Sequence, residues 1–379
     1  MKTDVSKDNT NYVLYAVYHD LTLEERSHEV YQAISHLPNV KIILNSLGSL
    51  PEEEAKSTIL FSPIERKRVG MLRLFSFWNL TKKLLKQYKP AVVVVHDDSV
   101  LIRYIKKHYP ETKIVFDQSE LEIDRKVTGL KTAFLKCCDL FGKNAVKQCD
   151  LFISANEERA IISKKYYNLD CKYIAFDNMH KIKEDNVGYE FFDKYKHIFS
   201  NDKLVIVYGG GIAIDRGTFD LINAVKNNDK LYLLVAGSEW NNLPKFNDVI
   251  VQDAIDNVEY VGYVSRREWG YIMKNASASV VFYDPTISLN FKYCASGKGY
   301  ESLFMGVPLI CSENPPLISL CEKYKCGVCN SDMGIAVKKL LDNYEYYKKN
   351  ALEFSSLIDY ENRIPELAKS LENELFSKS

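Results

Sequence analysis

The chain has 379 residues, 46% of them hydrophobic and 26% charged, so it is long enough for two cores and too apolar for disorder throughout. Lysine and arginine together number 50, as do aspartate and glutamate, and this balance argues against a dedicated nucleic-acid-binding protein. With 17 glycines and 11 prolines, the composition excludes collagen-like and low-complexity architectures.

The first predicted element is a strand over residues 13–17, which lies in an apolar run from Tyr12 to Tyr18 that ends at His19 and Asp20. That run is too short for a membrane span and wrongly flanked for a signal peptide. The sequence contains no stretch of 18 apolar residues. We therefore expect an intracellular chain that does not cross a membrane.

Short β-rich runs alternate with longer helical patterns through the first half of the chain. The run at 92–95 is valine throughout, as in strands that are buried on both faces of a parallel sheet. The expected strands are 13–17, 40–44, 91–95, 113–116, 151–154 and 173–176. The expected helices are 24–36, 72–88, 100–108 and 157–167.

Residues 61–90 hold eight Lys/Arg and a single acid, Glu65, with Phe75, Phe77 and Trp78 interleaved. Basic and aromatic residues on one helix suit an anionic membrane surface. The alternative is an ordinary sheet-covering helix with a solvated basic face. Both interpretations stay open at this point.

Polar residues follow the expected strand at 91–95, where His96, Asp97 and Asp98 lie at its carboxyl end and could orient an acceptor hydroxyl. Side chains there face the crevice in which doubly wound sheets bind ligands. The alternative is a capped turn into the helix that begins at 100.

Residues 177–202 break this rhythm and are polar, so we place the domain boundary there. The alternation then restarts, which predicts two consecutive doubly wound parallel sheets. The expected strands are 204–208, 232–236, 258–261, 279–283 and 309–311. The expected helices are 218–226, 266–274, 299–305 and 333–348, with one more helical segment at 358–375.

The strand at 204–208 runs directly into Gly209, Gly210 and Gly211, and a helix opens after Arg216. Glycines let the backbone approach a ligand closely and adopt positive φ. The following helix would offer free N–H groups and a positive dipole end to an anion. A tight turn without a ligand is the alternative.

A second polar loop leads into the helix expected after Ser296, which is a plausible N-cap. Lys298 would place a cation where helix N–H groups already favour a phosphate. Glu301, about one turn further along, is expected to face solvent and to accept hydrogen bonds from a ribose diol. The alternative for Lys298 and Glu301 is a solvated pair on the helix surface.

Cys321, Cys326 and Cys329 have a spacing that also occurs in one class of iron–sulfur ligand sets. A fourth ligand would have to come from far along the chain. We favour the simpler interpretation of a helix end, a turn at Gly327 and a short strand, with the cysteines as small hydrophobic residues.

Taken together, the two polar loops of the second half resemble those of the retaining GT-B glycosyltransferases of family 4, also called glycosyl transferases group 1. In that family the first turn reads Gly-Arg, four residues, then Lys-Gly. Gly210 and Gly217 match this pattern, Arg216 stands at the lysine position, and Gly211 replaces the arginine.

The later motif of that family has two glutamates eight positions apart, ahead of Gly-x-Pro. Glu301 matches the second glutamate and Tyr293 stands at the first. A variant of the motif with Asn, a gap and Lys-x-x-Glu fits Asn290, Lys298 and Glu301. The resemblance covers nearly the whole chain and is clearest over 203–329.

The first half resembles the same family at its Asp-x-His-Glu turn, where Asp117 and Glu120 are in place and Ser119 replaces the histidine. The resemblance implies a GT-B fold of two Rossmann-like domains facing across a cleft, with a C-terminal helix that crosses back. The implied domains are an acceptor domain at 1–180 with a returning helix at 358–379, a linker at 181–202 and a donor domain at 203–357.

The resemblance further implies transfer, with retention, of a sugar from a UDP- or GDP-sugar to a glycan or lipid-linked acceptor in surface polysaccharide biosynthesis. We expect no required cofactor or metal, no nucleic-acid partner, and a cytoplasmic location with peripheral contact at the inner face of the membrane through residues 61–90. The alternatives are a catalytically silent GT-B protein that binds a nucleotide sugar or a partner enzyme, and a nucleotide-sugar epimerase.

The resemblance assigns two sets of residues. The residues expected to act in transfer are Arg216, Lys298, Glu120 and His96. The residues expected around the donor are Gly209, Gly210, Gly211, Arg216, Asn290, Lys298, Gly299, Tyr300 and Glu301.

Overall fold

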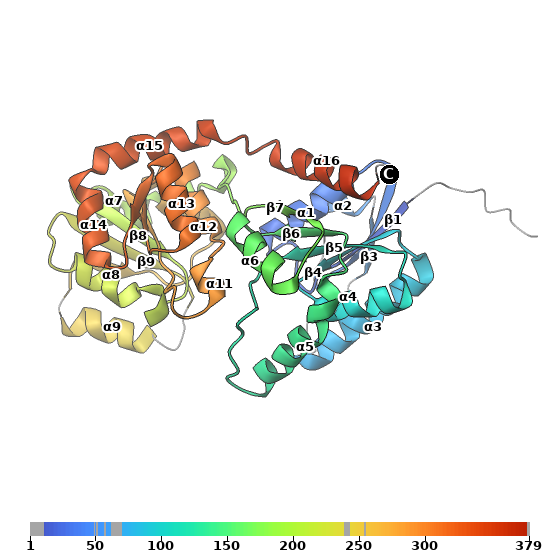
Figure 1. Cartoon of the computed structure of the whole chain (residues 1–379). Helices are drawn as coiled ribbons and strands as arrows, with labels where there is room; N and C mark the ends of the chain where they lie inside the picture. Colours follow the sequence, from blue (N-terminus) through green and yellow to red (C-terminus); the bar gives the residue numbers. More distant parts are fainter. Residues whose placement is uncertain are drawn as a thin grey trace, which may run out of the picture. The chain divides into compact units, whose positions relative to one another are not determined.

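The computed structural model describes residues 11–48, 50, 52–56, 58–61, 70–238, 243–253 and 255–376. The chain forms two compact units (Figure 1). The first runs to Asp177 and takes in the chain again from Tyr360, and the second spans Asn178–Asp359.

The first unit is a parallel seven-stranded sheet in the order β3-β2-β1-β4-β5-β6-β7. Its strands are β1 (Asn11–Ala16), β2 (Val40–Asn45), β3 (Thr58–Phe61), β4 (Val92–His96), β5 (Lys113–Gln118), β6 (Leu151–Ser154) and β7 (Lys172–Ala175). Its helices are α1 (Glu25–Ser35), α2 (Glu52–Ala55), α3 (Met71–Tyr88), α4 (Ser99–His108), α5 (Leu130–Val146), α6 (Glu157–Tyr167) and α16 (Arg363–Leu375).

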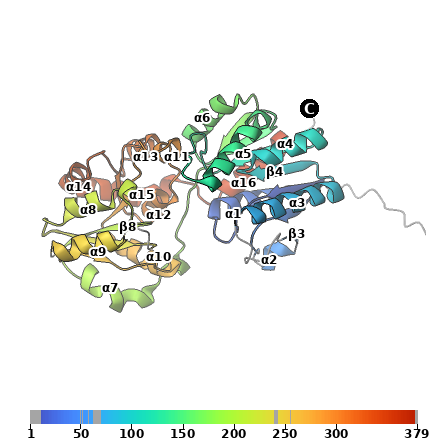
Figure 2. The ribbon, with the colours of Figure 1, turned by 90° about the horizontal axis from the view of Figure 1, so that it is seen from below.

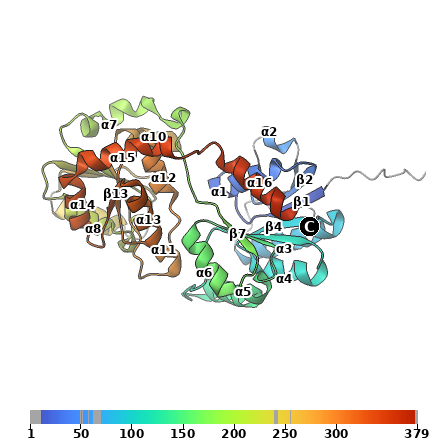
Figure 3. The same cartoon turned by 45° about the horizontal axis from the view of Figure 1, so that its top comes forward.

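Helices cover both faces of this sheet, as its apolar strands require. Side chains of α1 and α16 share one core cluster, and those of α3, α4 and α5 share the cluster on the other face. The ribbons of α3, α4 and α5 can be followed in Figure 2. The last helix packs beside α1 (Figure 3), so the C-terminal segment belongs to the first unit. Arg363 anchors its start through an ion pair of 3.0 Å between its Nη1 and Oε1 of Glu29.

The second unit is a parallel six-stranded sheet in the order β10-β9-β8-β11-β12-β13. Its strands are β8 (Leu204–Gly209), β9 (Leu231–Ala236), β10 (Val258–Tyr260), β11 (Ala278–Val281), β12 (Leu309–Cys311) and β13 (Gly327–Cys329). Its α-helices are α7 (Phe192–Phe199), α8 (Thr218–Val225), α9 (Leu243–Gln252), α10 (Arg266–Asn275), α11 (Leu289–Lys292), α12 (Gly297–Phe304), α13 (Pro315–Tyr324), α14 (Met333–Asp342) and α15 (Tyr344–Leu357). Single 3₁₀ turns are η1 (Glu184–Asn186), η2 (Tyr189–Phe191) and η3 (Ile214–Arg216).

Alternate residues of these strands enter opposite cores. Ile206 and Tyr208 pack with α8 and α14, whereas Val205 and Val207 pack with α7 and α10. The latter face continues into a third cluster formed by β12 with α12, α13 and α15. The expected α/β class with two doubly wound sheets is confirmed.

The segment 181–202, expected to be a linker, is instead part of the second unit. It forms η1, η2 and α7, and its Val187, Tyr195 and Ile198 are buried. The Tyr195 hydroxyl donates a hydrogen bond of 2.8 Å to Glu268 of α10. Its many charged residues gave it a linker-like composition, but its buried apolar residues join one core cluster with Tyr271 and Ile272 of α10.

The helix expected over 333–348 is two helices, because the chain leaves helical geometry at Asn343 (φ −133°, ψ 31°). Regular elements also occur where none was expected. These are β3, α2, α5, α7, α9 and α11, whereas only the end of α13 was expected. Most are short, and α5 has alternating apolar and basic residues that obscure its helical period.

Candidate functional site

The candidate site lies in the second unit at the carboxyl ends of β8 and β11. These neighbouring strands mark the place where the strand order reverses, since β9 lies on one side of β8 and β11 on the other. Doubly wound sheets bind ligands in the crevice outside such a reversal. The glycine turn that follows β8 opens there.

Gly210 shows why this turn needs glycine. Its φ of 151° is a conformation that side chains rarely adopt, and a β-carbon would lie 2.6 Å from Nζ of Lys298. Gly237, which follows β9, packs directly against the turn, because a β-carbon on it would lie 1.7 Å from the Gly210 carbonyl oxygen. A β-carbon on Gly209 would meet the Trp269 ring at 2.5 Å. Because Gly210 has no side chain, the backbone of the turn lies next to the Lys298 amine.

Arg216 ends the 3₁₀ turn η3, and its guanidinium lies against two aromatic rings. Its Cζ is 4.3 Å from the Tyr283 ring centre and 4.6 Å from that of Phe291. These contacts hold the guanidinium plane without neutralising its charge. The Asp284 N–H, next to Tyr283, donates a hydrogen bond of 3.1 Å to the Asp215 carbonyl and so connects η3 to the segment after β11.

Lys298 lies in the first turn of α12, and Ser296 is the N-cap as expected, although its hydroxyl makes no capping bond. Burial and then the positive charge of Arg216 lower the pKa of Lys298 to about 8. Among the described residues, neither Lys298 nor Arg216 has a carboxylate within ion-pair distance. The Glu301 carboxylate is close enough to raise the pKa of Lys298, but it forms no ion pair with it. Two neighbouring cations that no described carboxylate pairs, beside open backbone at a helix N-terminus, form a site suited to a phosphate group.

Glu301 was expected to face solvent, and this is wrong: the residue is only 4% exposed. Arg266 donates a short charge-assisted hydrogen bond to its Oε1, and Trp269 donates one of 3.3 Å to its Oε2. Burial would raise the pKa of Glu301, but His180 and Arg266 outweigh it and hold the pKa below its usual value. The carboxylate is therefore ionised, because partners from α10 and the segment after β7 compensate its burial.

The other residues expected around the sugar donor make fewer contacts with Arg216 and Lys298. Asn290 lies on α11 beside Phe291, and Gly211 accepts a hydrogen bond of 2.8 Å at its carbonyl from the Tyr208 hydroxyl. Gly299 and Tyr300 lie on another face of α12: Gly299 approaches Leu309 and Leu320, and the Tyr300 ring packs near Phe354. Both residues nevertheless follow Lys298 directly in the first turn of α12, and their contact with the donor stays a prediction.

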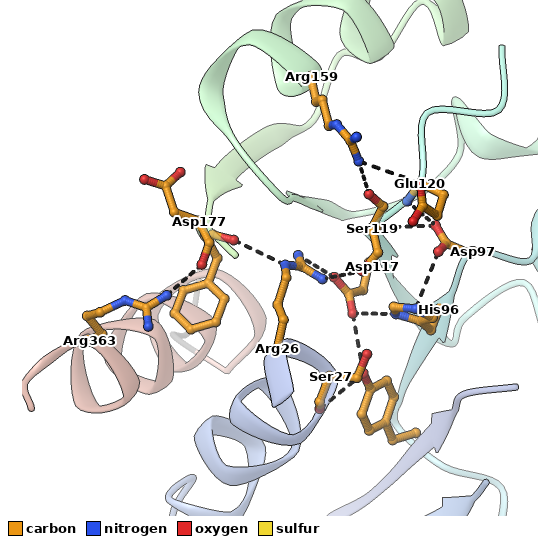
Figure 4. Close-up of polar contacts among 12 residues, drawn as sticks. Arg26, Ser27, His96, Asp97, Asp117, Ser119, Glu120, Arg159, Asp177 and Arg363 are labelled. Atoms are coloured by element: carbon orange, nitrogen blue, oxygen red, sulfur yellow. Dashed lines mark hydrogen bonds and ion pairs between the residues drawn. The ribbon is translucent and has the colours of Figure 1, made fainter. Parts of the chain in front are cut away.

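A second polar cluster occupies the corresponding place in the first unit, where β1 and β4 mark its own reversal of strand order (Figure 4). Asp117 of β5 is fully buried at its centre. One oxygen accepts from Arg26 at 2.7 Å, and the other contacts Nδ1 of His96 at 2.8 Å and Tyr15 at 3.3 Å. Burial alone would raise the pKa of Asp117, but Arg26 and His96 hold it well below its usual value.

His96, expected at this edge, has both ring nitrogens engaged. Its Nε2 lies 3.3 Å from Oδ2 of Asp97, whose Oδ1 accepts from the Ser119 N–H at 2.9 Å. Burial would lower the pKa of His96, but Asp97 and Asp117 outweigh it and raise the pKa above its usual value. Burial also raises the pKa of Asp97 to about 6. His96 is thus buried between two carboxyl groups that favour its protonated form. Of the two first-unit residues expected to act in transfer, His96 and Glu120, only Glu120 is accessible, with a side chain that is 55% exposed.

His19 packs edge-on against His96, with ring centres 5.3 Å apart. Burial and then the charge of His96 lower the pKa of His19 to about 4, so His19 is neutral at pH 7. The donor atoms of His19, His96 and Asp97 all lie within 4.8 Å of one another, a spacing that a metal ion could bridge. The ion pairs of His96 account for this cluster without one, and metal-independent chemistry stays a prediction.

Sequence reasoning missed the residues that hold these sites. Arg26 lies in an amphipathic helix that gives no sign of its buried ion pair, and Ser119, in the position of the family histidine, accepts from Arg26 Nη1 at 2.8 Å. Arg266 and Trp269, which bind Glu301, open α10 in a pattern typical of a surface helix. For Tyr283 and Phe291, which hold Arg216, the sequence did offer a signal, because both residues lie in or near the polar loop that precedes α12.

No family model matches the sequence, and a comparison with curated proteins finds no match. The fold, in contrast, matches solved structures over almost the whole chain. Sucrose-phosphate synthase from Thermosynechococcus elongatus aligns with a TM-score of 0.73 at 12% identity, over 98% of this chain and 100% of the other. WaaG, a glycosyltransferase involved in lipopolysaccharide biosynthesis, aligns with a TM-score of 0.64 at 12% identity, over 94% and 99%.

HepE of Anabaena, solved in complex with UDP and glucose, aligns with a TM-score of 0.65 at 9% identity, over 97% and 100%. The architecture is not restricted to transferases. A UDP-N-acetylglucosamine 2-epimerase aligns with a TM-score of 0.57 at 12% identity, over 98% of both chains. These similarities show a GT-B fold, and at such low identity they do not show the reaction.

Proposed function

We propose that the chain is a glycosyltransferase that moves a sugar from a nucleoside diphosphate sugar, bound on the second unit, to a glycan or lipid-linked acceptor. One observation carries this proposal: Arg216 and Lys298 lie beside the glycine turn at the reversal of strand order, and neither forms an ion pair with a carboxylate of the described residues. A diphosphate supplies the matching charge. The GT-B neighbours, HepE with UDP and glucose among them, support the same choice.

In this proposal the two phosphates lie against the Gly209–Gly211 backbone, Arg216 and Lys298. As the bond from the anomeric carbon to the phosphate oxygen breaks, negative charge develops on the leaving diphosphate, and both cations stabilise it. The acceptor oxygen forms the new bond, and its proton passes to the leaving phosphate. Transfer with retention follows the family resemblance and is part of the proposal.

Glu301 is assigned to the ribose of the donor. Its carboxylate is ionised and held by Arg266 and Trp269, which leaves lone pairs for a diol. In the first unit, we assign Glu120 to the acceptor because its carboxylate is exposed. His96 is assigned a positioning role, because it reaches Asp97 and Asp117 and both of its nitrogens are occupied.

Peripheral contact with an anionic membrane is proposed for the start of α3. No helix among the described residues combines the length and the apolar character that a membrane crossing requires. The basic residues 66–68 lie outside the described residues. Within α3, Phe77 is buried and Trp78 donates to Asp98 at 2.5 Å, whereas Leu72 is 69% exposed and Phe75 44%. A setting in surface polysaccharide biosynthesis at the cytoplasmic face fits this surface.

Two other functions have specific support. The UDP-N-acetylglucosamine 2-epimerase shares the architecture, and the replacement of two family residues by Gly211 and Ser119 would suit a protein that binds a nucleotide sugar without turning it over. A panel of UDP- and GDP-sugars separates these functions when binding is followed by thermal shift and products by chromatography. Release of nucleoside diphosphate supports transfer, an isomerised nucleotide sugar shows an epimerase, and binding without a product shows a silent protein.

A further inference from the structure

The proposed function makes no use of the cysteines that meet at the β12–α13–β13 edge of the second unit. Cys311 ends β12, Cys321 lies in the last turns of α13, and Cys329 ends β13. Cys311 and Cys329 are register partners on neighbouring parallel strands, so their side chains leave the same face of the sheet. Helix α13 covers that face and places Cys321 over both.

The three sulfur atoms converge. The Sγ atoms of Cys311, Cys321 and Cys329 all lie within 4.8 Å of one another. Zinc bonds thiolate sulfur at about 2.3 Å, which places sulfurs of a tetrahedral site about 3.8 Å apart. A contraction of about 1 Å at most, within the range of side-chain rotation, would bring the three sulfurs to a common ion.

A fourth thiol is near. Cys326, at the end of the turn between α13 and β13, is buried in the same core cluster as Cys311 and Cys321. Its sulfur is 3.8 Å from the Leu320 carbonyl oxygen. The distant ligand that the Cys321, Cys326 and Cys329 spacing lacked is therefore Cys311, which is close in space because β12 and β13 pair.

The surroundings decide which ions fit. Cys311, Cys321 and Cys326 are buried, and the cluster lies among apolar side chains that include Leu309, Leu317 and Phe354. The donor set is sulfur alone, which disfavours Mg²⁺ and Ca²⁺ because these ions prefer oxygen. Soft sulfur donors among buried apolar side chains suit Zn²⁺. By contrast, Cys149 and Cys171 form only a pair, with sulfurs 3.4 Å apart.

We propose that Cys311, Cys321 and Cys329 bind one Zn²⁺ ion, with Cys326 as the fourth ligand. Binding replaces the S–H bonds of the ligating thiols with Zn–S bonds and releases one proton to solvent for each thiol. The ion would tie the edge strand β13 and helix α13 to β12. Its role is structural, at a site separate from Arg216 and Lys298.

Zinc titration of the full-length protein, reduced and freed of metal, tests this proposal. A chromophoric chelator competes for the ion, and melting is followed in parallel. We expect one Zn²⁺ per chain and a higher melting temperature. Cys321→Ser and Cys329→Ser should each weaken binding by about 100-fold or more, since loss of a direct ligand exceeds the 10–100-fold effect of outer groups. Cys137→Ser, at an exposed cysteine, is the matched control and should bind as the wild type does.

Two measurements keep the test decisive if a buried variant folds poorly. Co²⁺ added to the wild-type protein should give the absorption of a thiolate–cobalt complex, and Zn²⁺ should protect these four cysteines from alkylation, read by peptide mass spectrometry. Failure to bind Zn²⁺, or wild-type affinity in folded Cys321→Ser and Cys329→Ser, overturns the proposal. Nucleoside diphosphate binding, measured on the same samples, reports separately on the proposed function.

Discussion

Arg216 and Lys298 present their charges at the same strand reversal, but they are held differently. The Arg216 guanidinium rests on two aromatic rings, whereas the Lys298 amine lies against the Gly210 backbone. A guanidinium stays charged at every accessible pH, and an amine does not. The site is therefore expected to depend on pH through Lys298.

Donor capture should weaken as Lys298 loses its proton, since its pKa is about 8. The protonated amine attracts the diphosphate and the neutral amine does not, so kcat/KM is expected to fall as pH rises through about 8. Lys298→Arg should move this fall to higher pH. A wild-type profile that stays level up to about pH 10 would contradict the role of the amine.

A second prediction concerns Glu301, whose buried carboxylate makes its replacement costly to the fold. Glu301→Ala leaves Arg266 and the Trp269 N–H without their acceptor, so it is expected to lower the free energy of unfolding by about 1–3 kcal/mol. Glu301→Gln keeps an acceptor oxygen and should fold, yet weaken nucleotide binding about tenfold, or 1.4 kcal/mol. Urea unfolding and calorimetric titration measure the two effects. Unchanged nucleotide affinity in Glu301→Gln would remove Glu301 from the ribose.

At the scale of elements, the aromatic and apolar residues of helix α3 are divided between its buried face and its exposed face. Phe77 and Trp78, which suggested a membrane helix, pack inward, and the exposed apolar residues are Met71, Leu72 and Phe75. The ring of Phe75 also contacts Phe134 of α5. The apolar face that remains is therefore confined to the first turns of α3.

Flotation with anionic liposomes tests this face. The protein is expected to co-float with them, and less so as salt rises, because each Lys or Arg near the surface adds about 1 kcal/mol that salt screens. Leu72→Asp with Phe75→Asp should reduce flotation, and Ile161→Asp on α6, where Ile161 is 55% exposed, is the control. Equal flotation with neutral lipid, or no effect of the α3 substitutions, would contradict membrane contact at α3.

The strands of both sheets could largely be predicted from the sequence, because apolar runs such as that of β4 are typical of buried parallel strands. Contacts between distant segments could not. The burial of Glu301 depends on α10, and the thiol cluster depends on the pairing of β12 with β13. The position of Lys298 at the start of a helix could be predicted because it depends only on neighbouring residues, and Lys298 does lie in the first turn of α12.

At the scale of the whole molecule, each unit places polar residues at its own reversal of strand order, cations in the second and a buried acid–base cluster in the first. Fixed charges on the donor side suggest that no ion needs to neutralise the leaving diphosphate. Turnover is therefore expected to persist in EDTA. Loss of activity that Mg²⁺ or Mn²⁺ restores would contradict this, whereas recovery with Zn²⁺ alone would concern the cysteine site.

The most direct measurement is the rate at which nucleoside diphosphate is released from the preferred nucleotide sugar by the wild type, Arg216→Ala and Lys298→Ala. Each substitution removes a group that stabilises the leaving diphosphate, so each is expected to lower the rate by about 10²-fold or more. Lys83→Ala, at an exposed lysine of α3, should match the wild type. Release at the wild-type rate in both Arg216→Ala and Lys298→Ala would contradict a donor site at the glycine turn.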